Sequence, residues 1–288
     1  ENVRRRALTF VVVGGGYAGV EALAEMEDMA RYATRYVDGI DGDDMRWVLV
    51  EASDRILPEV GPDLGEYTRQ QLEERGIEVR MRTRLVSVED GVAVLSDDEE
   101  LPTDTLVWTA GVRANPVLAS SDLPLDAQGR VMAQADLRVA GADGVLDGVW
   151  AAGDNAAVPD LTADDPTAVC SPSAQHAVRQ ATRLADNLVA VLDGRETTDY
   201  RHKHVGSVAS LGLYRGVAEV YGVKLRGFPA WFMHRTYHMS RMPTLNRKVR
   251  VVTDWTLALL FRREVVSLGT MHAPREEFAR AVSLTEAA

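Results

Sequence analysis

Residues 8–19, LTFVVVGGGYAG, predict the fold of the first half of the chain. An apolar, β-branched run leads into a G-x-G-x-x-G pattern, and residues 20–26 continue with the composition and spacing of a helix. A buried strand, a tight glycine turn and a helix in this order are typical of a dinucleotide-binding unit, because the backbone can approach a pyrophosphate at the helix N-terminus. We assign four residues of the turn to that ligand: Gly14, Gly16, Tyr17 and Gly19.

The second strand of such a unit is expected to end in an acidic residue, and Glu51 follows the apolar run at residues 47–50. It comes later than the usual ~20 residues after the glycines, and residues 29–44 account for the excess as a lengthened helix and a turn. A carboxylate here binds ribose hydroxyls and repels a 2′-phosphate. We therefore expect NAD(H) rather than NADP(H), with a plain strand-end charge as the alternative.

The rest of the chain divides into three predicted parts. A helix over residues 63–75, a strand over 77–80, a β-meander over 85–100 and a strand over 104–108 complete an α/β, Rossmann-like nucleotide-binding domain at 7–113. Shorter strands follow, one of which ends in Gly153-Asp154, and a strong helix spans 171–192. A Gly-Asp pair can offer a carboxylate to ligand hydroxyls, but an ordinary turn is equally expected. We place a second domain at 114–199 and a C-terminal region at 200–288.

Charge is distributed unevenly along the chain. The net charge is −11, yet the residues from Tyr200 onward hold 14 basic and 6 acidic side chains. Bulky apolar groups lie beside cations at residues 228–235 and 257–263, including Arg262 and Arg263. This composition favours contact with an anionic membrane surface, and the alternative is an amphipathic helix packed on its own domain. Nothing in the sequence indicates nucleic-acid binding.

Several classes of protein are disfavoured by what the sequence lacks. The single Cys170 excludes a C-x-x-C redox pair, a zinc cluster and a disulfide framework, and it suits a reducing cytoplasm. No run of 18 apolar residues and no secretory leader is present. The chain starts at Glu1 rather than at Met, and residues 1–6 look like the end of a preceding helix, so we expect a piece of a longer protein.

Taken together, the motifs resemble those of the type II NADH:quinone oxidoreductases, single-subunit flavoenzymes with two dinucleotide-binding domains. The resemblance runs from Arg4 to about Phe278. It depends on an ordered set of motifs, namely residues 11–21 (VVVGGGYAGVE), 108–111 (WTAG), 149–154 (VWAAGD) and 174–180 (AQHAVRQ).

The resemblance implies FAD and NAD as cofactors and hydride transfer from NADH to FAD, followed by transfer of two electrons to a membrane quinone without proton pumping. It gives Gly14, Gly16, Gly19 and Glu51 to NADH, and Ala110 and Gly111 to the nicotinamide end. It gives Gly153 and Asp154 to the flavin, and Ala174 and Gln175 to the quinone site beside the flavin ring. Glu21 would handle protons near the contact between nicotinamide and flavin, which makes Glu21 and Gln175 the expected catalytic pair. The expected location is peripheral, on the cytoplasmic face of the cell membrane, with a homodimer possible.

Two departures from the family pattern matter. The FAD-binding βαβ unit with which such enzymes start does not precede Glu1, so this chain alone should bind FAD poorly or not at all. His176 stands where relatives carry other residues, and it receives no role. The alternatives are a non-catalytic NAD-binding or redox-sensing module, and a soluble NADH-dependent flavin reductase of another electron carrier. Disulfide or peroxide reductases and sulfide:quinone oxidoreductases need cysteines at the flavin, and the lone Cys170 argues against them.

Overall fold

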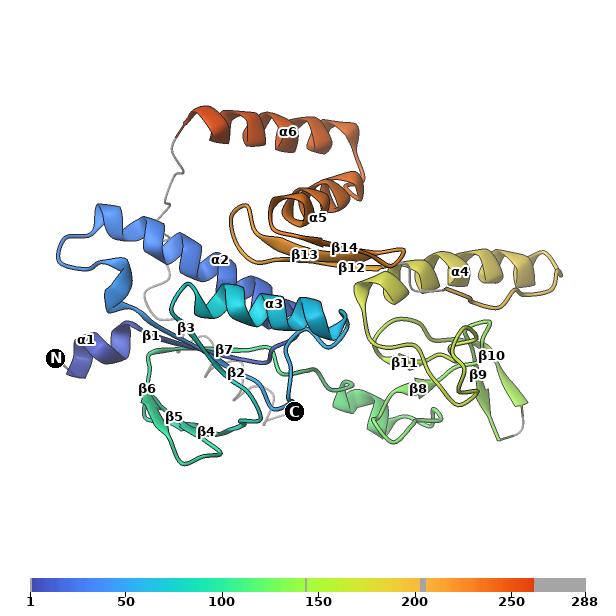
Figure 1. Ribbon diagram of the computed structural model, residues 1–288. Helices are drawn as coiled ribbons and strands as arrows, with labels where there is room; N and C mark the ends of the chain where they lie inside the picture. Colours follow the sequence, from blue (N-terminus) through green and yellow to red (C-terminus); the bar gives the residue numbers. More distant parts are fainter. Residues whose placement is uncertain (1, 143, 203–205, 262–288) are drawn as a thin grey trace.

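A computed structural model describes residues 2–142, 144–202 and 206–261 (Figure 1). After the short helix α1 (Asn2–Ala7), four parallel strands form the central sheet in the order β3-β2-β1-β7, and their bounds are Thr9–Val13 (β1), Arg46–Val50 (β2), Ile77–Arg80 (β3) and Thr105–Trp108 (β7). The connections between them contain helices α2 (Tyr17–Ala33) and α3 (Pro62–Glu73). The predicted α/β class with a parallel, Rossmann-like sheet is confirmed.

Both faces of this sheet are covered. Side chains alternate between the two faces along each strand, so each strand contributes to two apolar cores. Val12 and Leu49 point towards α2 and α3 and join the largest apolar core. Their neighbours in the same strands, Val11 and Val48, pack on the other face against a small antiparallel sheet. That sheet is the predicted meander, and its strands are β4 (Leu85–Glu89), β5 (Val92–Leu95) and β6 (Glu100–Pro102).

The connection from α2 to β2 contains the predicted lengthened helix and turn, but its last helical residues are 3-10 rather than α-helical. Helix α2 ends at Ala33, and only two 3-10 turns follow, Thr34–Tyr36 and Gly42–Asp44. The Asp41 side chain accepts from Asp43 N, and the Asp44 side chain accepts from Asp41 N, so these carboxylates satisfy backbone donors of a turn instead of continuing the helix.

The second unit is smaller and is built around helix α4 (Ala174–Leu192), which lies to the right in Figure 1. After the 3-10 turn Pro116–Ser120, its strands pair as two short sheets, an antiparallel pair of β9 (Arg138–Gly141) with β10 (Gly144–Trp150) and a parallel pair of β8 (Val131–Met132) with β11 (Ala156–Ala157). Their core includes Leu137, Val158 and Cys170. Asn187 links the helix to this core, because its buried amide donates to the carbonyls of Asp136 and Thr198 at 2.9 Å each.

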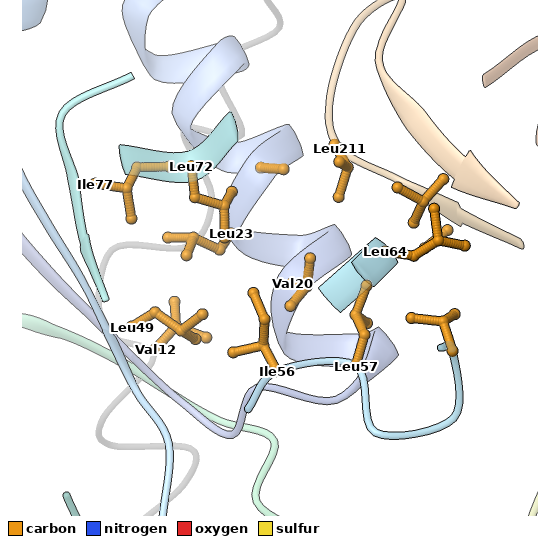
Figure 2. Packing of buried hydrophobic residues seen from close by; sticks show 14 of the residues in the cluster. Val12, Val20, Leu23, Leu49, Ile56, Leu57, Leu64, Leu72, Ile77 and Leu211 are labelled. Carbon is orange, nitrogen blue, oxygen red and sulfur yellow. The ribbon is translucent and has the colours of Figure 1, made fainter. Parts of the chain in front are cut away.

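The C-terminal region adds a sheet that the sequence analysis did not foresee. Its antiparallel strands are β12 (Gly206–Ser210), β13 (Gly216–Val220) and β14 (Val223–Arg226). Figure 2 shows Leu211 of this region pointing into the same core as Val20, Leu23 and Leu64 of the nucleotide-binding unit. The sheet therefore covers the outer side of α2 and α3.

Two helices complete the described chain, α5 (Phe228–Ser240) and α6 (Leu245–Leu260), and in Figure 1 they lie one above the other over the C-terminal sheet. Ala230 and Trp231 of α5 are buried against that sheet, whereas α6 buries no residue. The guanidinium of Arg235 lies 4.7 Å from the Trp231 ring centroid and 4.4 Å from that of Trp255, which joins the two helices. In the described residues no helix has the length and apolarity needed to cross a bilayer. The flanking cations Arg262 and Arg263, and Phe278, lie outside the described residues.

Candidate functional site

The glycine turn after β1 has the backbone geometry that a dinucleotide needs. Gly14 has φ +111°, and a side chain there would collide with the backbone of Thr109, which follows β7. A side chain on Gly19 would overlap the carbonyl oxygen of Gly14, so the helix packs directly on the turn. By contrast, the space beside Gly16 is open, and no side chain caps the N-terminus of α2 there. The first N–H groups of α2 are therefore available to a pyrophosphate.

Glu51 lies at the end of β2 and holds the glycine turn in place. Its Oε2 accepts from Gly15 N at 2.5 Å, and its Oε1 accepts from Ser53 N at 2.7 Å. Burial opposes ionisation of this carboxyl, but the N–H donors of Ser53 and Gly15 outweigh burial and keep its pKa below the ordinary value. Glu51 is thus an anion beside the expected adenosine position, and it also organises the loop.

Ala110 and Gly111 lie at the same edge of the sheet as the glycine turn. The Thr109 hydroxyl donates to Val13 O at 2.8 Å, and a side chain on Gly14 would come within 2.8 Å of Ala110 N. The structure therefore brings Gly14, Gly16, Glu51 and Ala110 together at the carboxyl ends of the parallel strands, which is where this kind of sheet binds its ligands.

Tyr17 differs from the other residues of the turn because its side chain packs into the main core. Burial raises the pKa of its phenol to about 12, with Ser207 and three carboxylates around it, those of Glu59, Glu21 and Glu219. The hydroxyl therefore stays protonated at neutral pH. Next to it, the loop before α3 and the C-terminal sheet enclose a cleft of about 760 Å³ whose lining includes Arg55, Glu59, Ser207, Glu219 and Tyr221.

Glu21 lies one helical turn after the glycine loop, where the C-terminal region meets α2. Its Oε1 accepts from the backbone N–H of Ser210 at 2.8 Å and lies 3.0 Å from His234 Nε2. Glu25 and Asp28 extend the same helix face and accept from the Ser210 hydroxyl and from Leu213 N. These carboxylates on α2 bind the end of β12 and the turn that follows it. The sequence did not indicate this contact.

The predicted flavin residues lie in the second unit. Gly153 follows β10 with φ +79°, and its N–H donates to Gln180 Oε1 at 2.7 Å. Gln180 is 2% exposed, so this polar side chain lies in the interior although its helix position would suit a solvated surface residue. Its role became visible only when α4 was placed against the Gly153 turn. The carboxylate of Asp154 is exposed to solvent beside that turn, so it is available to ligand hydroxyls.

Ala174 and Gln175 form the first turn of α4, as predicted. Ser173 caps this helix by accepting from His176 N at 3.2 Å, and Ala174 is exposed while Gln175 is half-buried. His176 lies beside them and pairs through Nδ1 with the hydroxyl of buried Tyr200 at 2.9 Å.

Comparison with known proteins identifies the family of the chain. The family model described as pyridine nucleotide-disulphide oxidoreductase matches residues 1–181. The chain belongs to this family. It is 32% identical over 235 residues to the type II NADH:quinone oxidoreductase of Staphylococcus haemolyticus, with 79% of this chain and 55% of that protein covered. It is 28% identical over 275 residues to the type II NADH:quinone oxidoreductase Ndh of Mycobacterium tuberculosis, with 90% and 56% covered.

A solved structure shows the same fold. The structure of NDH2 from Plasmodium falciparum in complex with NADH superposes with a TM-score of 0.80 at 15% identity, and covers 93% of this chain and 69% of that chain. The chain spans about half the length of the curated relatives above. Membership of the pyridine nucleotide-disulphide oxidoreductase family implies FAD and NAD(H) as its cofactors.

The residues present fit both cofactors. The open space at Gly16 and the uncapped start of α2 suit a pyrophosphate, and the exposed Asp154 beside Gly153 suits ligand hydroxyls. The family name mentions a disulphide, but Cys170 is the only cysteine of the chain. It is buried, and burial raises its thiol pKa to about 11, which leaves it protonated and unreactive at neutral pH.

Proposed function

We propose that this chain forms the NADH-binding part of an FAD-dependent NADH:quinone oxidoreductase that does not pump protons. The observation that carries the proposal is the glycine turn with Glu51 at the edge of a parallel sheet. The chain that contains it is similar to a curated type II NADH:quinone oxidoreductase. The FAD, when bound, takes up the two electrons of the hydride and passes them on. The chain's own residues bind and orient NADH, hold the quinone and supply protons.

In this proposal the pyrophosphate of NADH binds at Gly14, Gly16 and Gly19, and the adenosine ribose binds to Glu51. Because a carboxylate there repels a 2′-phosphate, kcat/KM for NADH should exceed that for NADPH by roughly tenfold or more. Steady-state measurements with both donors, on the protein that also includes the remaining flavin-binding part, test this. Equal values would contradict the assignment. An inert protein that still binds NADH would favour the non-catalytic NAD-binding module.

Quinone is proposed to bind at the start of α4, next to Ala174 and Gln175. Replacing Gln175 by Leu should slow the quinone half-reaction by roughly tenfold, while the other half-reaction, anaerobic reduction of FAD by NADH, keeps its rate. Gln128→Leu, the same replacement in an exposed turn, is the matched control. The placement fails if both half-reactions slow together, or if neither changes.

The proposal places the enzyme peripherally on the cytoplasmic face of an anionic membrane, through α6. Exposed Val249, Val252, Leu259 and Leu260 alternate there with Arg247, Lys248 and Arg250. Cations contribute roughly 1 kcal/mol each near an anionic surface, and salt screens them as the Debye length falls from about 10 Å at 0.1 M to about 3 Å at 1 M. Apolar burial remains under high salt.

Co-sedimentation with phosphatidylserine-containing vesicles over a salt series tests this placement. The native protein should bind at low salt and partly at high salt, whereas a Leu259→Gln, Leu260→Gln variant should release fully at high salt. Val86→Gln, which changes an exposed apolar residue of β4, should bind like the native protein. A native protein that stays in the supernatant at low salt would indicate a packing or homodimer role for α6.

A further inference from the structure

Three ionisable side chains form a continuous series of contacts from α2 to the surface of α5. Glu21 Oε1 lies 3.0 Å from His234 Nε2, and the ring of His234 lies 4.5 Å, centroid to centroid, from the ring of His238 at an interplanar angle of 61°. The two histidines share one face of α5 because they are four residues apart. On α5 the series therefore runs from His234, whose side chain is 17% exposed, to His238, which is exposed to solvent.

Glu21 is placed where a proton can leave the series towards the cofactor site. It is one helical turn after the glycine loop, and its backbone partner Ser210 occupies the same oxygen that faces His234. Its other oxygen, Oε2, accepts no hydrogen bond from any residue in the described part of the chain. One carboxylate oxygen is thus held by the protein, and the other is left for a ligand or a proton.

The proposed reaction needs such a supply. Its balance is NADH + H⁺ + quinone → NAD⁺ + quinol. The hydride carries two electrons and one proton, whereas the quinol holds two added protons, so one proton per turnover must come from solvent. Histidine is the side chain whose ordinary pKa suits it to exchange protons near neutral pH.

We infer that His238 and His234 conduct this solvent proton to Glu21, with His234 also positioning the Glu21 carboxylate. This inference rests on the proposed quinone reductase function. Both histidines act through Glu21, so both are positioning and conducting residues. The wide separation of the partners in the sequence, on α2 and α5, makes the C-terminal region a functional part of the site as well as its cover.

The charged surroundings are compatible with conduction. Glu21 and Glu25 face the series from α2, Ser210 contributes only its backbone and hydroxyl from β12, and Tyr237 packs edge-on against His238 on α5. Burial lowers the pKa of His238, its neighbour His234 lowers it further, and Glu21 raises it. His238 therefore releases a proton more readily than an isolated imidazole and can return to the neutral form between turnovers.

The kinetic test uses the FAD-loaded enzyme with His234→Gln, His238→Gln and the control Tyr237→Phe, which keeps the ring on α5 and removes only a hydroxyl. Both glutamine variants should reduce quinone roughly tenfold more slowly at pH 8 than the native enzyme, and the deficit should shrink at pH 6. In both glutamine variants the anaerobic reduction of FAD by NADH should keep its native rate. The Tyr237→Phe variant should keep the native rates of both half-reactions. Added imidazole should restore the rate of His238→Gln, because a small base can replace the missing exposed ring.

A second readout does not depend on turnover. In NMR titrations of the imidazole Cε1–H signals, His234→Gln should raise the pKa of His238, since one of the groups that lower it is removed. His238 is exposed, so its replacement keeps the test valid if His234→Gln fails to fold.

The inference is overturned if both glutamine variants reduce quinone at native rates or if imidazole fails to rescue His238→Gln. It is also overturned if His234→Gln leaves the pKa of His238 unchanged. A native enzyme that oxidises NADH but reduces no quinone would instead overturn the proposed function, and the His238 titration would still report on the coupling of the rings.

Discussion

Helices α2 and α4 both begin directly after a candidate binding loop, yet they differ in how far their apolar side chains are buried. In α2 the apolar residues Val20 and Leu23 lie in the main core, and the carboxylates of the same helix bind the C-terminal region. In α4 the buried residues include the polar Gln180 and Asn187, while apolar side chains remain exposed, namely Val178, Leu188, Val189, Val191 and Leu192.

Among the described residues, the nucleotide-binding unit has its apolar surfaces covered, whereas the second unit leaves an apolar side of α4 exposed. The first has covered faces on its sheet and a further layer over its helices. The second exposes an apolar helix side of the kind that normally contacts another layer of structure. Since the chain spans about half the length of its curated relatives, we propose that the other part of the flavin-binding domain covers α4.

The largest effect is expected at Arg75, which follows α3 and contacts both α2 and the C-terminal region. Arg75 pairs with Glu27, which is 1% exposed, and donates to the carbonyls of Ala24 and Leu211 at 2.8 Å each. Arg75→Met leaves Glu27 with Arg31 alone, so the free energy of unfolding should fall by about 3 kcal/mol or more. Chemical denaturation measures this loss.

Arg69, on α3 shortly before Arg75, provides the control. It pairs with Glu66 and Glu73 at the surface, so Arg69→Met should cost about 1 kcal/mol or less. Equal losses for the two arginine variants would show that the contact between α2, α3 and the C-terminal region does not stabilise the first unit.

A smaller effect is expected inside the second unit. Asn187→Leu removes two donated hydrogen bonds and the acceptor of Thr198 N, and it leaves the carbonyl of buried Asp136 without this partner. Unfolding should become easier by about 1–3 kcal/mol. Asn155→Leu, at an exposed position, should change stability by less than about 0.5 kcal/mol. An unchanged denaturation midpoint in Asn187→Leu would mean that α4 is not anchored through this amide.

The smallest effect on this chain is expected on the exposed side of α4. This variant tests most directly whether another part of the protein covers that side. Val189→Gln should alter the stability of the chain alone by less than about 0.5 kcal/mol. In the protein that includes the remaining flavin-binding part, the same change should lower the melting temperature measurably, because an apolar contact is lost. Val86→Gln should have little effect in either form. A Val189→Gln variant with the same small effect in both forms would contradict the proposed cover.

The first unit was largely predictable because its signals are local. Gly14 adopts φ +111° within the turn and Gly19 packs directly on the carbonyl of Gly14, so both glycines have a local signal. The meander follows from alternation along short segments. The sheet at β12–β14 has the same kind of alternation, with a turn at Tyr221-Gly222. The basic and apolar composition of the region favoured membrane contact instead, so no sheet was predicted there.

The contacts of Glu21 and Gln180 could not be predicted in the same way. Glu21 meets Ser210 across 189 residues, and Gly153 meets Gln180 across 27. One sequence contains no information on which distant segments meet. The helix pattern of α4 was correct, but it could not show that the apolar side is exposed while two amides are buried.

The hydrogen bond from Arg75 to the carbonyl of Leu211 also has a consequence for the time course of synthesis. The two residues are 136 positions apart. At a translation rate of roughly 5–20 residues per second, the nucleotide-binding unit emerges from the ribosome roughly ten seconds before its cover. During that interval Val20, Leu23 and Leu64 lack their partner Leu211. The nascent chain should therefore be a substrate for chaperones that bind apolar helix faces, until the strand ending at Ser210 arrives and closes the core.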